Sequence, residues 1–117
     1  MTSGNTFTGP PGSVDVRLEE DPPLVLVTLA GEVDTDLGPE FERCVDEALA
    51  ARRPVVVDAT DVTFMDSTGL GFLARLASRS GERRITVRGA PEHVRHLVHR
   101  ARLEEMIDLQ TRPGTPA

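Results

Sequence analysis

A serine directly after an aspartate, at the start of an expected helix, is the feature of this chain that is best placed to do chemistry. Asp66, Ser67, Thr68 and Gly69 follow apolar residues that end at Met65, and they open an amphipathic segment. Backbone N–H groups at a helix start favour negative charge, so a phosphate on Ser67 would be tolerated there. We interpret Ser67 either as a helix cap or as a phosphorylation switch, and Asp66 could cap the helix instead.

Two other motifs near this serine lack the context that their chemistry needs. The stretch from Gly69 to Ala74 fits the dinucleotide pattern G-x-G-x-x-A, but it falls inside the expected helix, about ten residues past the preceding strand. The G-x-S-x-G turn that carries the nucleophile of many serine hydrolases would need glycine at position 65, where this chain has methionine. The sequence leaves open whether the chain binds a nucleotide weakly.

The histidines and the cysteine indicate neither a metal site nor a nucleophile. His93, His96 and His99 recur every third residue, whereas helical metal sites prefer i, i+4 pairs with a carboxylate. They predict a solvated helix face, although the sequence leaves a catalytic pairing with Ser67 open. Cys44, the single cysteine, lies on an apolar helix stripe and is expected to be buried and inert. We therefore expect no metal, no cofactor and no enzymatic activity.

Composition narrows the function classes further. The 117 residues suggest one domain, and all 13 basic residues are arginine, which excludes lysine-dependent phosphate loops and Schiff-base chemistry. The net charge of −6 argues against nonspecific nucleic-acid binding. Residues 1–66 carry 14 acids and 4 arginines, whereas residues 67–117 carry 5 acids and 9 arginines. This asymmetry predicts either two faces of opposite charge or ordinary solvated helices.

Hydrophobic periodicity predicts a single α/β domain over residues 13–110, between flexible tails at residues 1–12 and 111–117. Strands are expected at 13–19, 24–30, 55–58 and 85–88, with 106–109 as a last strand or turn. Helices are expected from a cap at Thr35 or Asp36, after Asp66, and from Pro91. This order implies a mixed sheet of four to five strands packed with three or four helices.

The chain offers no signal peptide and no apolar run long enough to cross a bilayer, since the longest is Leu24 to Val27. A single cysteine also excludes an internal disulfide and fits a reducing compartment. We therefore expect a cytoplasmic protein without membrane insertion.

Two motifs resemble the STAS domain of bacterial anti-sigma factor antagonists. Residues 29–34, Leu-Ala-Gly-Glu-Val-Asp, look like the family's L-x-G-E-[LIV]-D segment. Residues 62–71, Val-Thr-Phe-Met-Asp-Ser-Thr-Gly-Leu-Gly, look like its V-x-F-[LMI]-D-S-[ST]-G-L-G signature. The resemblance covers residues 13–110, and the second motif is specific at this length.

The resemblance implies a partner switch. In that family an anti-sigma factor, which is a serine kinase with a histidine-kinase-like ATPase fold, phosphorylates the serine that corresponds to Ser67. The unphosphorylated antagonist binds this kinase and frees a sigma factor, and a serine phosphatase reverses the release. Carried over, Asp66, Thr68 and Gly69 shape the turn around Ser67, and Asp34 lies on an adjacent loop near the partner surface, or acts as a turn residue.

The resemblance also leaves an alternative function and one departure. Small STAS-like proteins serve as accessory subunits of lipid-transporting ABC systems, or as modules of larger signalling assemblies, without a phosphoserine cycle. Where many relatives have a small-residue-Gly-Leu turn after the third helix, this chain has Arg100-Ala101-Arg102-Leu103. Whether the free domain forms a weak homodimer stays open.

Overall fold

The computed structural model describes residues 4–8, 12–81 and 83–110. The strands of the described chain are β1 (Gly4–Thr8), β2 (Ser13–Glu20), β3 (Pro23–Val33), β4 (Val55–Met65), β5 (Ile85–Arg88) and β6 (Ile107–Gln110). The α-helices are α1 (Gly38–Ala50), α2 (Ser67–Arg79) and α3 (Glu92–Arg100), and short 3-10 segments are η1 (Thr35–Leu37) and η2 (Leu103–Glu105). The predicted α/β domain with a mixed sheet is confirmed.

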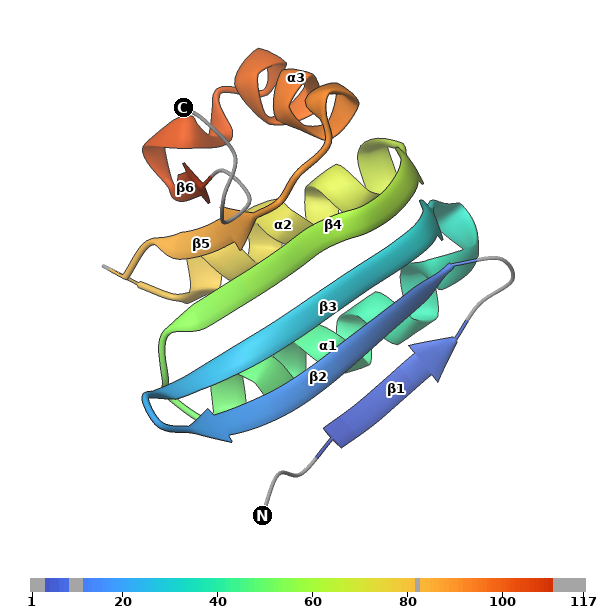
Figure 1. Cartoon of the computed structure of the whole chain (residues 1–117). Coiled ribbons are helices and arrows are strands. Elements are labelled where there is room, and N and C mark those ends of the chain that lie inside the picture. Colours follow the sequence, from blue (N-terminus) through green and yellow to red (C-terminus); the bar gives the residue numbers. More distant parts are fainter. Residues whose placement is uncertain (1–3, 9–11, 82, 111–117) are drawn as a thin grey trace.

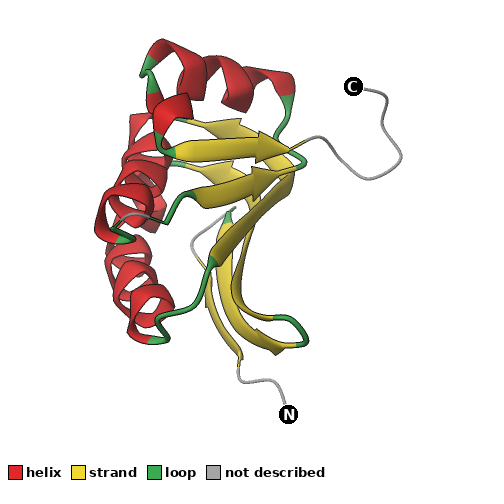
Figure 2. Cartoon of the chain, turned by 90° about the vertical axis from the view of Figure 1, so that its left-hand side faces the viewer, coloured by secondary structure: helices red, strands yellow, loops and turns green. Residues whose placement is uncertain are grey.

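The strands lie in the sheet in the same order as in the chain (Figure 1). β1, β2 and β3 pair antiparallel, whereas β3 to β6 pair parallel. Each parallel connection contains a helix, as such crossovers require. Figure 2 shows the helices gathered on one side of the sheet.

The core lies between this helical layer and the sheet. Alternating residues of the strands are buried, as in β3, where Val25, Val27 and Leu29 have no exposed surface. Phe41 of α1 stacks on Phe72 of α2, with ring centroids 4.4 Å apart and planes inclined by 16°. Burying a large apolar side chain contributes about 1.5–3 kcal/mol, so this pair holds both helices in one layer.

Residues 4–8 correct the prediction of an N-terminal tail. They form β1, an edge strand paired with β2 from Gly4↔Arg17 to Thr8↔Ser13. The sheet therefore has one strand more than the four to five predicted. The segment is rich in glycine and threonine and shows little apolar periodicity, so its strand state depends on backbone pairing with β2. The predicted C-terminal tail, 111–117, lies outside the described residues.

β3 and β4 are longer than the sequence predicts, because strand structure continues through polar residues. The strand expected at 24–30 continues to Val33 in β3, and the strand expected at 55–58 continues to Met65 in β4. The register between the two strands shifts twice, between Thr28 and Ala30 and between Gly31 and Glu32, and each shift places an extra residue in β4. Such bulges reverse the side-chain alternation that a pattern argument assumes.

Asp58 stabilises the first of these bulges. Its side chain accepts a hydrogen bond from the Thr60 backbone N–H at 3.0 Å and lies 3.6 Å from the Arg88 guanidinium. Partial burial alone would raise the pKa of Asp58, but the hydrogen bonds from Thr60 and the charge of Arg88 lower it below its ordinary value. The carboxylate therefore stays charged where β4 bends.

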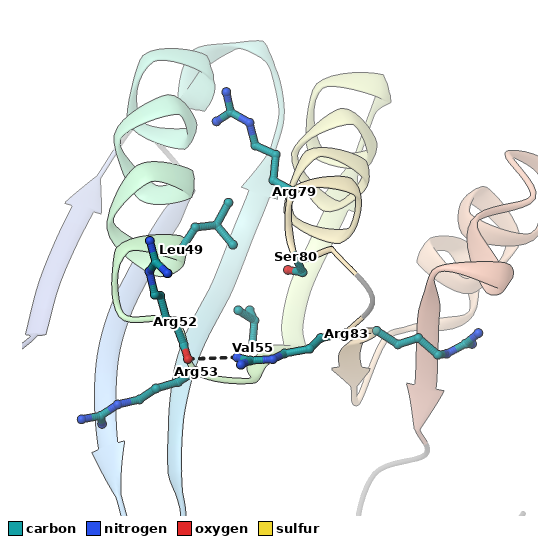
Figure 3. Close-up of a pocket in the computed structure, with 8 residues that line it drawn as sticks. Leu49, Arg52, Arg53, Val55, Arg79, Ser80 and Arg83 are labelled. Atoms are coloured by element: carbon teal, nitrogen blue, oxygen red, sulfur yellow. Dashed lines mark hydrogen bonds between the residues drawn. The ribbon is translucent and has the colours of Figure 1, made fainter.

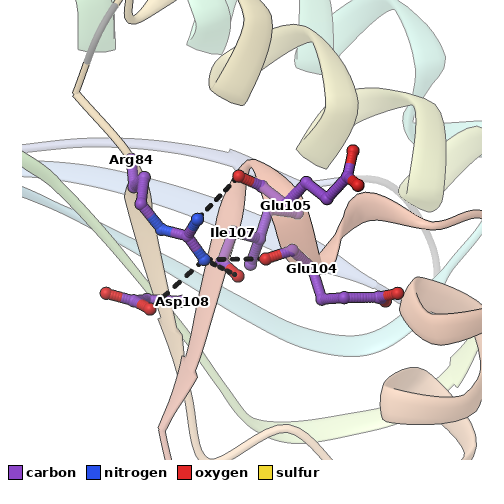
Figure 4. Close-up of polar contacts among 5 residues, drawn as sticks. All are labelled: Arg84, Glu104, Glu105, Ile107 and Asp108. Atoms are coloured by element: carbon purple, nitrogen blue, oxygen red, sulfur yellow. Dashed lines mark hydrogen bonds and ion pairs between the residues drawn. The ribbon is translucent and has the colours of Figure 1, made fainter.

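Arg84 anchors the last part of the fold, immediately before β5. Its guanidinium donates to the backbone carbonyls of Glu104, Glu105 and Ile107 at 2.7, 2.6 and 3.1 Å (Figure 4). It also lies 3.4 Å from the Asp108 carboxylate. One side chain thereby ties η2 and the start of β6 to the sheet.

An arginine in the left-handed backbone conformation follows each of two helices. Arg52 after α1 has φ 53°, and Arg102 after α3 has φ 57°. Glycine is usual at this position because it adopts positive φ without strain. Arg102 belongs to the stretch in which the sequence departs from the small-residue-Gly-Leu turn, so the chain keeps the turn geometry with an arginine.

Candidate functional site

The candidate site lies where β3 and β4 end side by side. Val33 and Met65 are register partners at the carboxyl ends of these parallel strands, and the Asp66 N–H donates to the Val33 carbonyl at 3.2 Å. Asp34 and Asp66 each follow directly. The two motifs therefore form adjacent turns. Thr35 of one turn and Thr68 of the other are in contact, although they are 33 residues apart in sequence.

Asp66, and not Ser67, caps α2. Its backbone is extended (φ −111°, ψ −166°), and its side chain accepts a hydrogen bond from the Thr68 N–H at 2.8 Å. Ser67 is the first helical residue, and its side chain is exposed. Within the residues that the structure describes, the Ser67 hydroxyl has no hydrogen-bond partner. The interpretation of Ser67 as the N-cap is wrong, because the aspartate before it already serves the free N–H groups.

Asp34 plays the same part in the neighbouring turn. Its side chain accepts from the Asp36 N–H at 3.0 Å and caps η1, so its observed role is that of a turn residue. The sequence placed the cap at Thr35 or Asp36. Thr35 instead faces the other turn, with its hydroxyl oxygen 3.4 Å from that of Thr68. The two turns thus contact each other through side chains as well as backbone.

Gly69 lets α2 approach the strand ends closely. A Cβ at this position would lie 2.6 Å from Val33 Cγ1 and 2.7 Å from Met65 Cγ. Real Cβ contacts are longer than 3.0 Å, so any larger residue would push the helix start away from β3 and β4. Gly69 is buried and shapes the turn, whereas Ser67, two residues earlier, is exposed.

Sequence reasoning missed Phe64 as a surface residue. Its side chain is 47% exposed, and among the described residues it is the single large hydrophobic side chain exposed to this degree. Val62 and Met65 on either side are buried. The second bulge turns Phe64 outward, three residues before Ser67. The unequal spacing of Val62, Phe64 and Met65 was the one available signal, because strict alternation cannot bury all three.

Negative charge dominates the sequence around these turns. Glu32, Asp34, Asp36 and Asp66 belong to them or precede them, and neither 31–38 nor 59–74 contains an arginine. Asp36 and Ser67 are exposed, and Asp34 and Asp66 are half-buried. The arrangement is thus an acidic surface that also carries the exposed Ser67 hydroxyl and an exposed aromatic ring.

The other candidate residues lie away from these turns. The three histidines are exposed on α3, where His96 lies 3.7 Å from Glu92, and His99 lies 3.6 Å from Glu104 of η2. Within residues 4–8, 12–81 and 83–110, no three histidine, cysteine or acidic side chains converge to hold a metal. Cys44 is buried, and burial raises its pKa to about 12. The glycines of the G-x-G-x-x-A pattern lie within α2, not in a strand-to-helix turn.

Comparison of the chain with known protein families identifies its family. The family model described as "Mlab, STAS domain" matches residues 16–110. The chain belongs to the STAS domain family. This STAS domain has no significant match among the curated proteins compared. Its two motifs lie inside the matched range and meet at the ends of β3 and β4.

Solved structures share the fold of this STAS domain. An anti-sigma factor antagonist from Mycobacterium paratuberculosis superimposes with a TM-score of 0.71 at 24% identity, covering 92% of this chain and 86% of that one. A Thermotoga maritima protein, provisionally named an anti-sigma factor antagonist, gives 0.69 at 14% identity over 84% and 86%. The antagonist SpoIIAA in its unphosphorylated form gives 0.54 at 18% identity over 79% and 81%. At these identities the likeness shows the SpoIIAA-like fold.

Among the described residues, every helix is too short or too polar to cross a membrane.

Proposed function

We propose that this STAS domain is an anti-sigma factor antagonist whose binding is switched by phosphorylation of Ser67. The observation that carries the proposal is the division of roles at the start of α2. Asp66 caps the helix, which leaves the Ser67 hydroxyl exposed and without a partner among the described residues. Family membership and the fold shared with solved antagonists support the same role.

A phosphate at this position would change partner binding more than folding. It adds about −1.5 to −2 charges at neutral pH, next to the Asp66 carboxylate. The helix N-terminus offsets part of this repulsion in the free domain, by roughly 0.3–2 kcal/mol. Burying the same charge unpaired in an interface costs roughly 2–5 kcal/mol, which corresponds to about 30- to several-thousand-fold in affinity. Binding would therefore be lost without refolding.

The surface around Ser67 suits a protein partner. Phe64 offers an exposed ring that could bury apolar area, and the adjacent turns of Asp34 and Asp66 offer polar groups around it. The partner we propose is a serine kinase with a histidine-kinase-like ATPase fold, which holds a sigma factor until the antagonist binds. A serine phosphatase would restore Ser67, and the antagonist itself would act in the cytoplasm without catalysing a reaction.

The test is a pull-down from the native host with wild type, Ser67→Asp and Ser78→Asp. Ser78 is exposed near the other end of α2, so Ser78→Asp adds the same charge to the same helix away from the site. We expect an ATPase-fold kinase to be recovered with wild type and Ser78→Asp, and to be reduced at least about 30-fold with Ser67→Asp. Ser67→Ala should bind and resist release by ATP.

The same experiment separates the alternative function. Recovery of a permease or a transporter ATPase at equal levels with wild type and Ser67→Asp would make the domain an accessory subunit of a lipid-transporting ABC system. That result would reject the phosphorylation switch, because the added charge at Ser67 would have no effect on the partner.

A further inference from the structure

An arginine-lined groove lies at the opposite end of α2 from Ser67. Its first hollow, of about 400 Å³, lies between the ends of α1 and α2 and is lined by Arg52, Arg79 and Arg83, among others. A second hollow of about 240 Å³ adjoins it through Arg79 and adds Arg75. We call these four residues and the two hollows the arginine groove. Along α2, Arg79 lies ~18 Å from Ser67, which is 12 residues at 1.5 Å each, and Arg75 lies ~12 Å from it.

Arg52 and Arg83 leave most of their guanidinium donors unused. Arg83 donates one N–H to the Arg52 backbone carbonyl at 2.9 Å, which holds the two residues side by side (Figure 3). Neither guanidinium has a carboxylate partner among the described residues.

The neighbouring arginines differ in how far they are engaged. Arg79 lies 3.6 Å from Asp46, but both side chains are more than half exposed, so this pair is weak. Arg53 and Arg84 also line the first hollow, yet they already bind the backbone carbonyls of Glu19 and Glu104, among others. Arg52, Arg79 and Arg83 therefore provide the available positive charge.

The shape and donors of the groove favour a chain of carboxylates over a single phosphate. The ends of α1 and α2 present backbone carbonyls here, which disfavour any anion, so binding must come from the guanidinium groups alone. The N–H groups of a helix start, on which compact phosphate sites usually rely, are not part of this groove. The two adjoining hollows make an elongated site with guanidinium groups spaced along it. Carboxylate side chains spaced along a peptide match that pattern through forked hydrogen bonds.

We propose that the arginine groove binds an acidic segment of a partner protein. The chain has a net charge of −6, so an acidic partner is repelled by the protein as a whole and needs a local group of free guanidinium groups such as this groove. Glu42 and Asp46 line the second hollow, which places the strongest attraction at Arg52 and Arg83. The interaction is independent of the proposed Ser67 switch.

The test uses a fluorescein-labelled octaglutamate peptide at low salt, with binding followed by fluorescence anisotropy. The double variant Arg52→Gln/Arg83→Gln should lose about 5-fold in affinity, as expected for two partly exposed ion pairs. The control Arg95→Gln/Arg100→Gln removes the same charge from exposed positions of α3 and should change affinity by less than about 2-fold. Ser67→Asp should bind as wild type does, which keeps this test separate from that of the proposed function.

Arg79→Gln provides a second, milder variant if the double variant fails to fold, because Arg79 lies exposed on α2. It should lower affinity in the same direction. Equal losses in the groove and control variants would overturn the proposal, since net charge alone would then explain binding. The proposal also fails if octaglutamate does not bind while pyrophosphate or phosphatidylglycerol vesicles bind in a manner that requires Arg52 and Arg83.

Discussion

Asp66 and Ser67 are neighbours with different tasks in the fold. The Asp66 carboxylate is committed to the Thr68 N–H, so replacing it would remove a helix cap worth about 1 kcal/mol. Ser67 makes no such contact within the described residues, and changes there should act on binding much more than on folding. This separation is what allows a single residue to serve as a switch.

Gly69 and Gly71 provide a matched pair for testing how closely α2 must approach the sheet. Gly69→Ala should lower the free energy of unfolding by about 1–3 kcal/mol, because its Cβ would overlap Val33 and Met65. A Cβ at Gly71 meets nothing within 4 Å, so Gly71→Ala should raise stability by up to about 1 kcal/mol through helix propensity. Urea unfolding of both variants measures the difference, and equal effects would refute the close approach.

At the scale of elements, η2 and β6 are held by Arg84 in addition to the packing of Ile107 in the core. β6 has four residues and η2 has three, and within η2 no residue is buried. Three carbonyls of this segment accept hydrogen bonds from the Arg84 guanidinium. The same charge at another position could not replace it, because the contacts depend on the forked geometry of the group.

Arg84→Met should therefore loosen β6 selectively. We expect a loss of about 1–2 kcal/mol in the free energy of unfolding, allowing for the partial exposure of these bonds. Amide hydrogen exchange in β6 should accelerate more than in β3. Arg100→Met, an exposed change on α3, is the control and should alter neither quantity appreciably. Uniform acceleration in all strands would show instead that Arg84 stabilises the whole domain.

At the scale of the molecule, the length of α2 separates an acidic surface from an arginine-lined one. The acidic turns around Ser67 lie where β3 and β4 end, and the arginine groove lies where α1 and α2 end. Parallel connections force this arrangement, because each helix runs back from the end of one strand to the start of the next.

The core between these surfaces should open only with global unfolding, and Cys44 reports on it. The thiol is fully buried, and its pKa of about 12 leaves about one thiolate in ten thousand at pH 8. Labelling of native Cys44 with a disulfide reagent should therefore be limited by unfolding and should accelerate with denaturant. A Ser78→Cys variant supplies an exposed thiol for comparison. Equal native labelling rates at Cys44 and at this exposed position would contradict a closed core.

The sequence alone determined the order of the main elements, the buried face of α1 and the residues of the two motifs. These features depend on local periodicity and on capping chemistry, both of which are written in neighbouring residues. The prediction that Cys44 is buried and unreactive followed from the same helical spacing. The raised pKa of the buried thiol agrees with it.

Only the tertiary structure decided how these parts meet. Bulges in β4 turned Phe64 outward, pairing with β2 made a strand of residues 4–8, and the close approach of α2 to β3 explained Gly69. Arg52, Arg79 and Arg83 came together because α1 and α2 end side by side. Each of these outcomes depends on contacts between segments far apart in sequence, which local patterns cannot encode.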